Sequence, residues 1–167
     1  MLFGSRKKLK IAVAADLGDA NQSSPAVGDL ARRYFDQGYN CAQSVLLSTA
    51  DMLGVDVPLA MVKGAASFTG GVGKSGCICG ALVGASLILG VISVSDTKPQ
   101  KGKKALDLTG QFHDIFKANF RSTCCRVLRK DRTFKDKDAD LRCKELTART
   151  AELLIDMLNE VHGTRNT

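Results

Sequence analysis

The sequence predicts an all-α fold: a single-domain helical bundle of about five to six helices around a central apolar, glycine-rich helix. Apolar residues recur three and four residues apart in several segments, the spacing that places side chains on one face of a helix. No residue from Ser75 to Ser95 carries a charge, so this segment must lie in a core or in a bilayer. A chain of 167 residues fits one domain and can bury a core without disulfides.

We divide the chain into a flexible or degenerate leader segment at residues 1–24, a helical domain at residues 25–162 and a tail at residues 163–167. Pro25 opens the first helical pattern of the domain, because proline suits the first turn of a helix. Gly38 ends that pattern.

The leader joins a basic stretch, residues 5–10, to a short apolar stretch, residues 11–15. This order resembles a twin-arginine export signal in which lysine replaces the second arginine. Asp16 and Asp19 cut the apolar stretch below the roughly 7–15 residues that a signal needs. We therefore expect a cytoplasmic protein, with export to the periplasm through this degenerate leader as the alternative.

Asn40 and Gly54 bracket the second predicted helix, residues 41–53. Asparagine is a favourable N-cap, and glycine closes a helix by adopting the left-handed conformation. Cys41 falls in the first turn, where unpaired N–H groups and the helix dipole favour a thiolate. Proline then begins a short third helix at about residues 58–66.

Glycines at four positions make residues 70–76 a bend. The Gly71-x-Gly73-x-x-Gly76 spacing resembles a dinucleotide-binding loop, but no β-strand pattern precedes it. We therefore favour a bend that serves helix packing over a nucleotide site.

The segment from residue 77 to about residue 94 is apolar around its whole circumference, which fits a central core helix or a membrane span. Gly80-x-x-x-Gly84 permits close helix approach in either setting. Aromatic belts are missing from both ends, and the amphipathic helices elsewhere need a surface to pack on. We therefore expect a soluble central helix and no membrane span. Two further helices are predicted at residues 103–120 and 138–161.

The six cysteines mark the candidate site, because they are too many to be only buried small side chains. They are Cys41, Cys77, Cys79, Cys124, Cys125 and Cys143. All lie at or near the ends of predicted helical segments. Four thiolates from separate segments could close around an iron–sulfur cluster or a tetrahedral zinc ion. The spacing matches no zinc knuckle or ferredoxin run, so both centres stay open at this point.

Four motifs, in order, resemble the redox-active protein family named for its C_GCAxxG_C_C cysteine pattern. The segment Cys79-Gly80-Ala81-Leu82-Val83-Gly84 matches the CGAxxG element, and residues 34–45 resemble the first-cysteine segment. Residues 125–128 resemble the third-cysteine segment, and Cys143 takes the fourth place. The resemblance covers roughly residues 26–161.

The resemblance implies an all-helical protein related to the amino-terminal domain of split-Soret cytochrome c. It implies electron transfer or redox sensing by a cysteine-ligated iron–sulfur centre of the [2Fe–2S] type. The implied metal ligands are the four family cysteines, Cys41, Cys79, Cys125 and Cys143. Cys77 and Cys124 fall outside the pattern. Backbone amides of the implied cofactor-binding glycines, Gly73, Gly76 and Gly80, are expected to bond sulfur and tune the potential.

Two other functions stay open, so the sequence does not decide whether the chain is an enzyme. In a thiol–disulfide protein, Cys41 would be the low-pKa attacking thiol and Cys79 the resolving thiol. In a structural protein, the family cysteines would bind zinc or remain buried thiols.

The formal net charge of +7, with the excess between Lys98 and Arg149, raises the possibility of an anionic partner. No aromatic platform or groove-reading motif accompanies the basic residues, so we expect no nucleic acid. Residues 129–132 and 135–138 mix both signs, which favours a solvated face over a docking patch. We expect a redox partner protein, with an acidic partner as one option. The split-Soret resemblance also suggests a homodimer.

Overall fold

The computed structural model describes residues 24–94, 103–130 and 136–163, and every regular element in these ranges is a helix. The elements are α1 Ser24–Asp36, α2 Cys41–Leu53, α3 Leu59–Ala65, the 3₁₀ helix η1 Ala66–Phe68, α4 Gly80–Ser93, α5 Lys103–Phe120, α6 Cys125–Arg129 and α7 Lys137–Gly163. The all-α prediction is confirmed.

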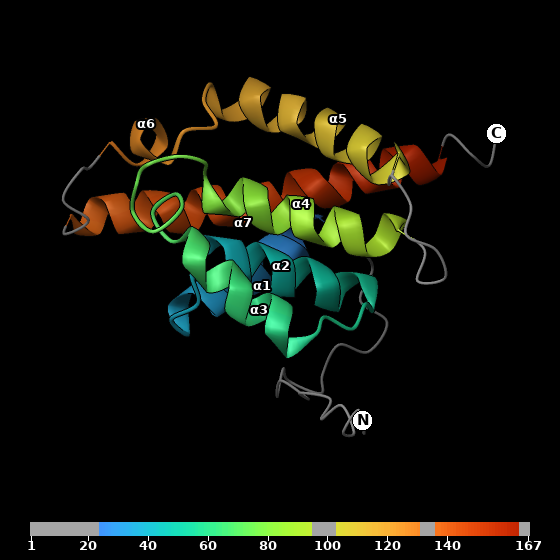
Figure 1. Ribbon diagram of the computed structural model, residues 1–167, viewed down its shortest axis with the longest axis horizontal. Coiled ribbons are helices and arrows are strands. Elements are labelled where there is room, and N and C mark those ends of the chain that lie inside the picture. Colours follow the sequence, from blue (N-terminus) through green and yellow to red (C-terminus); the bar gives the residue numbers. More distant parts are fainter. Residues whose placement is uncertain (1–23, 95–102, 131–135, 164–167) are drawn as a thin grey trace, which may run out of the picture.

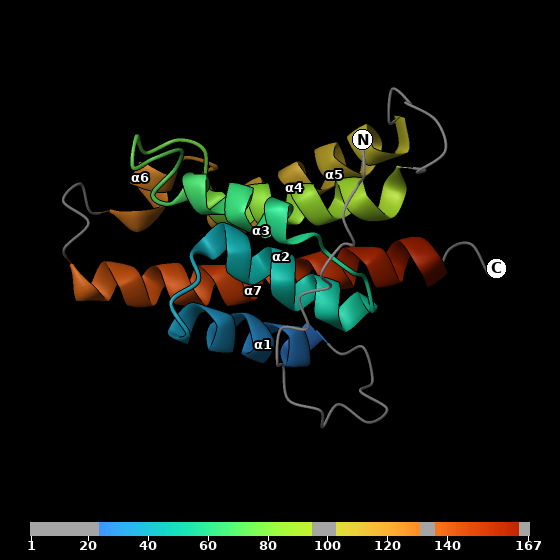
Figure 2. The same ribbon diagram turned by 60° about the horizontal axis from the view of Figure 1, so that its bottom comes forward.

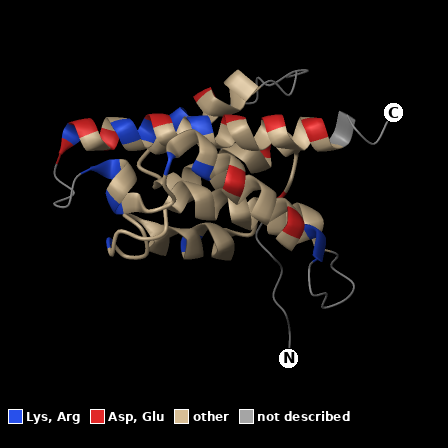
Figure 3. Ribbon diagram, turned by 90° about the horizontal axis from the view of Figure 1, so that it is seen from above, with Lys and Arg blue, Asp and Glu red and all other residues tan. Residues whose placement is uncertain are grey.

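The bundle is built on the long helix α7, against which α1 packs most extensively (Figures 1 and 2). Helix α2 lies between α1, α3, α4 and α7, while α4 packs against α2, α3, α5 and α7. The predicted central apolar helix is therefore present as α4, and it shares the centre of the bundle with α2. Charges of both signs follow one another along α7 (Figure 3).

The boundaries of α2 follow from the predicted caps. The Asn40 side chain accepts a hydrogen bond from the Gln43 N–H, and the Gln43 side chain accepts one from the Asn40 N–H. Gly54 closes the helix in the left-handed conformation, with φ 64°. The Asn40 amide also donates to the carbonyl of Ala66, so the start of α2 is tied to the end of α3. These contacts fix the position of Cys41.

Helix α4 begins at Gly80 rather than at residue 77, so the prediction of its start is wrong. The glycine bend continues through Cys79. Hydrogen bonds within the bend fold its backbone back on itself. The N–H of Gly73 donates to the carbonyl of Ser67, and the N–H of Lys74 donates to that of Thr69. The bend even holds Lys74 at a positive φ of 67°.

The other boundaries agree closely with the predictions, with one addition. Helix α5 spans the predicted residues, and α7 begins one residue earlier than expected, at Lys137. The short helix α6 was not predicted. Apart from Ser24, the predicted leader lies outside the described residues, as does the tail after Gly163. No helix in the described ranges is long and apolar enough to cross a membrane.

Candidate functional site

The four family cysteines meet at one end of the bundle. Cys41 begins α2, Cys79 is the N-cap of α4, Cys125 begins α6 and Cys143 lies in the second turn of α7. In both views of the ribbon, the glycine bend, α6 and the start of α7 lie at the same end (Figures 1 and 2). Four segments far apart in the sequence therefore bring their thiols to one region. All six cysteines are free thiols.

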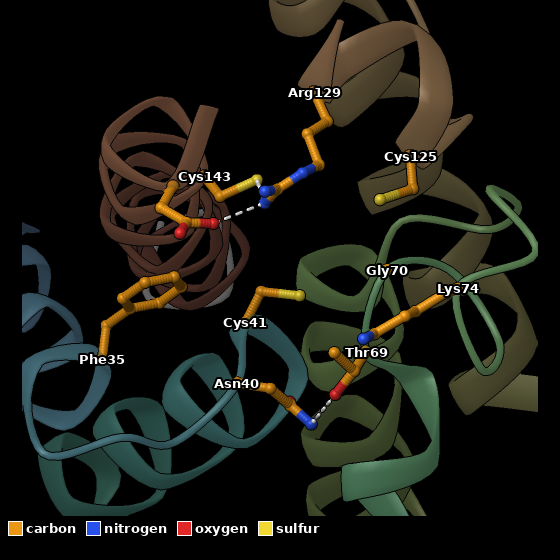
Figure 4. A pocket seen from close by; sticks show the side chains of 10 residues that line it. Phe35, Asn40, Cys41, Thr69, Gly70, Lys74, Cys125, Arg129 and Cys143 are labelled. Carbon is orange, nitrogen blue, oxygen red and sulfur yellow. Dashed lines mark hydrogen bonds and ion pairs between the residues drawn. The ribbon is translucent and has the colours of Figure 1, made fainter. Parts of the chain in front are cut away.

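A pocket of about 280 Å³ lies between these segments. It is lined by Phe35, Asn40, Cys41, Thr69, Gly70, Lys74, Cys125, Arg129, Asp140 and Cys143. The sulfur atoms of Cys41 and Cys125 point into the space between their two segments (Figure 4). Three of the four predicted ligands thus share one pocket.

Cys79 lies behind the pocket wall, next to Cys41. Its side chain is 4% exposed, and a Cβ added to the adjoining Gly80 would lie only 2.6 Å from the sulfur of Cys41. The Cys79 N–H donates to the carbonyl of Thr123 at 2.8 Å, which ties the start of α4 to the segment before α6. Gly80 therefore permits the close approach of α4 and α2 that brings Cys79 beside Cys41.

Burial raises the pKa of the four family cysteines, which we call the inner thiols. For Cys79 it is the largest cause, and the neighbouring Cys41 and Cys125 act in the same direction. The N–H groups of Ala81 and Leu82 lower the pKa of Cys79, although no capping hydrogen bond forms there. Because burial outweighs these dipoles, the Cys79 thiol is protonated at neutral pH in the absence of a ligand.

Cys41 was expected to have a low pKa, and the structure gives the opposite direction. Burial, followed by the neighbouring Cys143 and Cys125, raises the pKa of Cys41 to about 12. The first-turn N–H groups lower it, as the sequence argument supposed, but their effect is smaller. Desolvation between packed helices therefore dominates over the helix terminus.

A buried arginine faces the thiols from α6. Arg129 is 6% exposed, and its Nη1 lies 2.7 Å from a carboxylate oxygen of Asp140. The same nitrogen donates to the sulfur of Cys143 at 3.6 Å (Figure 4). The pKa of Cys125 is raised to about 11, first by burial and then by Cys143, while Arg129 opposes the shift. The site thus carries a positive charge beside its sulfur atoms.

The sequence analysis missed Arg129, because it assigned the surrounding mixed-sign run to a solvated face. One signal was present: Arg129 follows Cys125 by four residues, a spacing that puts both on one face of a helix. Lys74, whose role in the pocket was also missed, stands in the bend that the sequence marked by its glycines.

The glycines differ in how they serve the site. The N–H of Gly73 donates to Ser67, and that of Gly76 donates to the carbonyls of Gly70 and Gly71, both at 3.1 Å. These amides close the bend in this structure, and the hydrogen bonds to sulfur expected of them stay a prediction. Gly80 contributes instead through its missing side chain.

Cys77 and Cys124 lie outside this group. Cys77 is exposed and Cys124 is half-buried. The thiol of Cys124 donates to the carbonyl of Gly76 at 2.9 Å, and Cys124 is the side-chain hydrogen-bond partner of Cys77. This hydrogen bond raises the pKa of Cys77, while the charge of Arg126 lowers it. The two cysteines outside the family pattern therefore form a separate outer pair.

The inner thiols surround the pocket without closing on one point. Within the described ranges, no three side chains of His, Cys, Asp or Glu form a group that could hold a metal ion. The arrangement is a ring of thiols and one arginine around a small space.

A helical bundle that gathers four thiols from four segments at one end has the residues of a cysteine redox or metal site. The chain belongs to the family described as "Putative redox-active protein (C_GCAxxG_C_C)", whose sequence model matches residues 39–157. Comparison with curated proteins and with solved structures gives no match. The family resemblance stated from the motifs is confirmed.

Proposed function

We propose that this redox-active protein transfers or senses electrons through an iron–sulfur centre of the [2Fe–2S] type. Its ligands are Cys41, Cys79, Cys125 and Cys143. The observation that carries the proposal is the meeting of these four thiols, from α2, α4, α6 and α7, around one end of the bundle. Four cysteine thiolates are the usual ligand set of such a cluster.

A single zinc ion and a two-iron cluster need different arrangements of the four thiolates. Four thiolates on one tetrahedral zinc have their sulfur atoms about 3.8 Å apart. A two-iron cluster needs only two thiolates on each iron, so it accepts a wider ring of sulfur atoms. Within the described residues no three His, Cys, Asp or Glu side chains form a group that could hold a metal ion, so metal and sulfide analysis must decide between the two centres.

The surrounding charges also suit an anionic centre. Thiolate ligands and cluster sulfides carry negative charge, and the pocket is lined by two cations, Arg129 and Lys74, against one carboxylate, Asp140, which pairs with Arg129. When bound, the centre supplies one-electron chemistry at a potential that the protein sets. The residues of the chain exclude water, hold the ligands in place and offset their charge. Because the ligand thiols must lose their protons, binding should strengthen as pH rises.

The proposal is tested on the full chain purified without oxygen, or reconstituted with iron and sulfide. A brown protein that contains iron and acid-labile sulfide, and whose visible absorption is bleached by dithionite, supports it. A colourless protein that binds zinc in stoichiometric amount, and takes up no iron and sulfide under reconstitution, overturns it.

The thiol–disulfide alternative, with Cys41 attacking and Cys79 resolving, is less well supported. Cys79 is buried and Cys41 is half-buried, and burial is the largest cause that raises both pKa values. Unlike the exposed Cys77, these two thiols are also hard for a disulfide to reach. Rapid alkylation of Cys41 near neutral pH would favour this alternative.

A further inference from the structure

A disulfide between the outer pair, Cys77 and Cys124, would join the two segments that carry Cys79 and Cys125. Cys77 stands two residues before Cys79, and Cys124 stands directly before Cys125. The segment with Cys77 precedes α4, and the segment with Cys124 follows α5. Each outer cysteine is therefore attached to an inner one by a very short stretch of chain.

Hydrogen bonds already hold the two segments together. The N–H of Arg126 donates to the carbonyl of Gly76 at 3.0 Å, and its guanidinium donates to the carbonyl of Ser75 at 2.8 Å. The Cys124 thiol donates to the same Gly76 carbonyl. That carbonyl belongs to the peptide unit that leads into Cys77, so the Cys124 sulfur lies beside the Cys77 backbone.

Exposure separates the roles of the two thiols. Cys77 is exposed and can be reached by a reagent or a partner, whereas Cys124 is half-buried and its thiol lies 2.9 Å from the carbonyl oxygen that precedes Cys77. An accessible thiol next to a shielded second thiol is the arrangement of an attacking and a resolving cysteine.

We infer that Cys77 and Cys124 form a reversible disulfide, by exchange with a low-molecular-weight disulfide such as oxidised glutathione. The Cys77 thiolate attacks one sulfur of the disulfide, a mixed disulfide forms and the first small thiol leaves. The Cys124 sulfur then attacks the Cys77 sulfur and the second small thiol leaves. Two electrons pass from the cysteine pair to the reagent, and the two protons end on the released thiols.

The bond would join the glycine bend covalently to the segment before α6. Since Cys79 and Cys125 follow within two residues, the disulfide would restrict the separation of two inner thiols and the opening of the pocket between them. The disulfide itself does not depend on the proposed cluster. Only its effect on the pocket rests on the proposed function.

The experiment equilibrates the full chain, without metal, in defined ratios of reduced to oxidised glutathione. After acid quenching and trypsin digestion, mass spectrometry looks for a link between two peptides. One begins at Ser75 and contains Cys77 and Cys79, and the other is peptide 122–126 with Cys124 and Cys125. We expect these peptides to be joined, with the loss of two hydrogens, in the oxidised sample and separate in the reduced sample.

Single variants assign the link. Cys77→Ser and Cys124→Ser should each remove the joined peptides, whereas the control Cys79→Ser should keep them. Persistence of the link at unchanged yield in Cys77→Ser, or oxidation only within one peptide, overturns the inference. Circular dichroism of Cys77→Ser checks that the exposed substitution leaves the helices formed.

Iron and sulfide content separates this inference from the proposed function. The double variant Cys77→Ser with Cys124→Ser should lose the disulfide and still assemble the cluster. If wild-type protein forms the outer disulfide but takes up no iron, the inference is supported and the proposed cluster is overturned. If wild-type protein takes up iron but never forms the joined peptides, the cluster is supported and the disulfide inference is overturned.

Discussion

The inner and outer cysteines are the same residue type, separated by one position in one case and two in the other, yet they stand in different environments. Cys79 is 4% exposed and has its pKa raised by burial, while Cys77 is exposed. Cys125 is buried, while the adjoining Cys124 is half-buried and bonds the carbonyl of Gly76. Within each of these two neighbouring pairs, the family cysteine is therefore the more buried one, which suits it to hold a cofactor and leaves the other for exchange.

The largest test of this division compares Cys79→Ser with Cys77→Ser in anaerobically reconstituted protein. We expect Cys79→Ser to lose nearly all cluster iron, because one of four thiolate ligands is gone and the helix start has no replacement. Cys77→Ser should keep wild-type iron and sulfide content. Visible absorption and iron analysis measure both, and equal loss in the two variants would remove the distinction between inner and outer sets.

Arg129 provides a second test, because it lies beside the inner thiols and contributes a charge rather than a thiol. Arg129→Met removes a buried guanidinium that contacts Asp140 and Cys143. Because hydrogen bonds between charged groups are lost, we expect the free energy of unfolding to fall by about 1.5–3 kcal/mol. Urea unfolding of the protein without metal measures the change.

The matched control is Arg126→Met, on the same helix, whose exposed guanidinium makes one hydrogen bond, to the carbonyl of Ser75; a loss of no more than about 1 kcal/mol is expected because water can replace this bond. In cluster-loaded protein, Arg129→Met should also lower the midpoint potential, because a positive charge beside the centre stabilises its reduced state. An unchanged potential would show that Arg129 acts on folding alone.

The sequence allowed the helices and the ligand set to be predicted where local chemistry decides them. Asn40 and Gly54 fixed α2 because their capping roles need only neighbouring residues. The start of α4 was missed because the N–H of Cys79 donates to the carbonyl of Thr123, a contact with a distant segment that no local pattern indicates. Arg129 was missed because the contacts that bury it come from α7, a separate segment.

Gly80 tests the close approach that unites α2 and α4. A Cβ at this position would lie 2.6 Å from the Cys41 sulfur and 3.0 Å from the carbonyl oxygen of Phe68. We expect Gly80→Ala to lower the free energy of unfolding by about 1–3 kcal/mol, as overpacking does in cores. Gly90, on the same helix, has nothing within 4 Å of an added Cβ.

Gly90→Ala should therefore raise the free energy of unfolding by about 0.5–1 kcal/mol, because alanine is the better helix former. Urea unfolding of both variants decides the point. Equal effects of the two substitutions would mean that the contact between Gly80 and Cys41 does not limit the packing.

The smallest and most specific expected effect is a pH dependence of the free energy of unfolding that arises from the inner thiols. In the folded protein without metal, the pKa of Cys41 is raised from 9.0 to about 12, and that of Cys125 to about 11. Unfolding would let these thiols ionise near their ordinary pKa. The unfolded chain thus binds fewer protons in this window, so the contribution of these thiols to the free energy of unfolding is constant below about pH 9 and falls as pH rises toward 12.

Urea unfolding at about pH 8 and about pH 10 measures this fall. Cys41→Ser should make it smaller, because one thiol with a raised pKa no longer contributes. Cys77→Ser should leave most of the fall in place, because the buried thiols remain. If the two variants lose stability with pH to the same extent as wild type, other groups carry the dependence, and the inner thiols are less shielded from water than their burial implies.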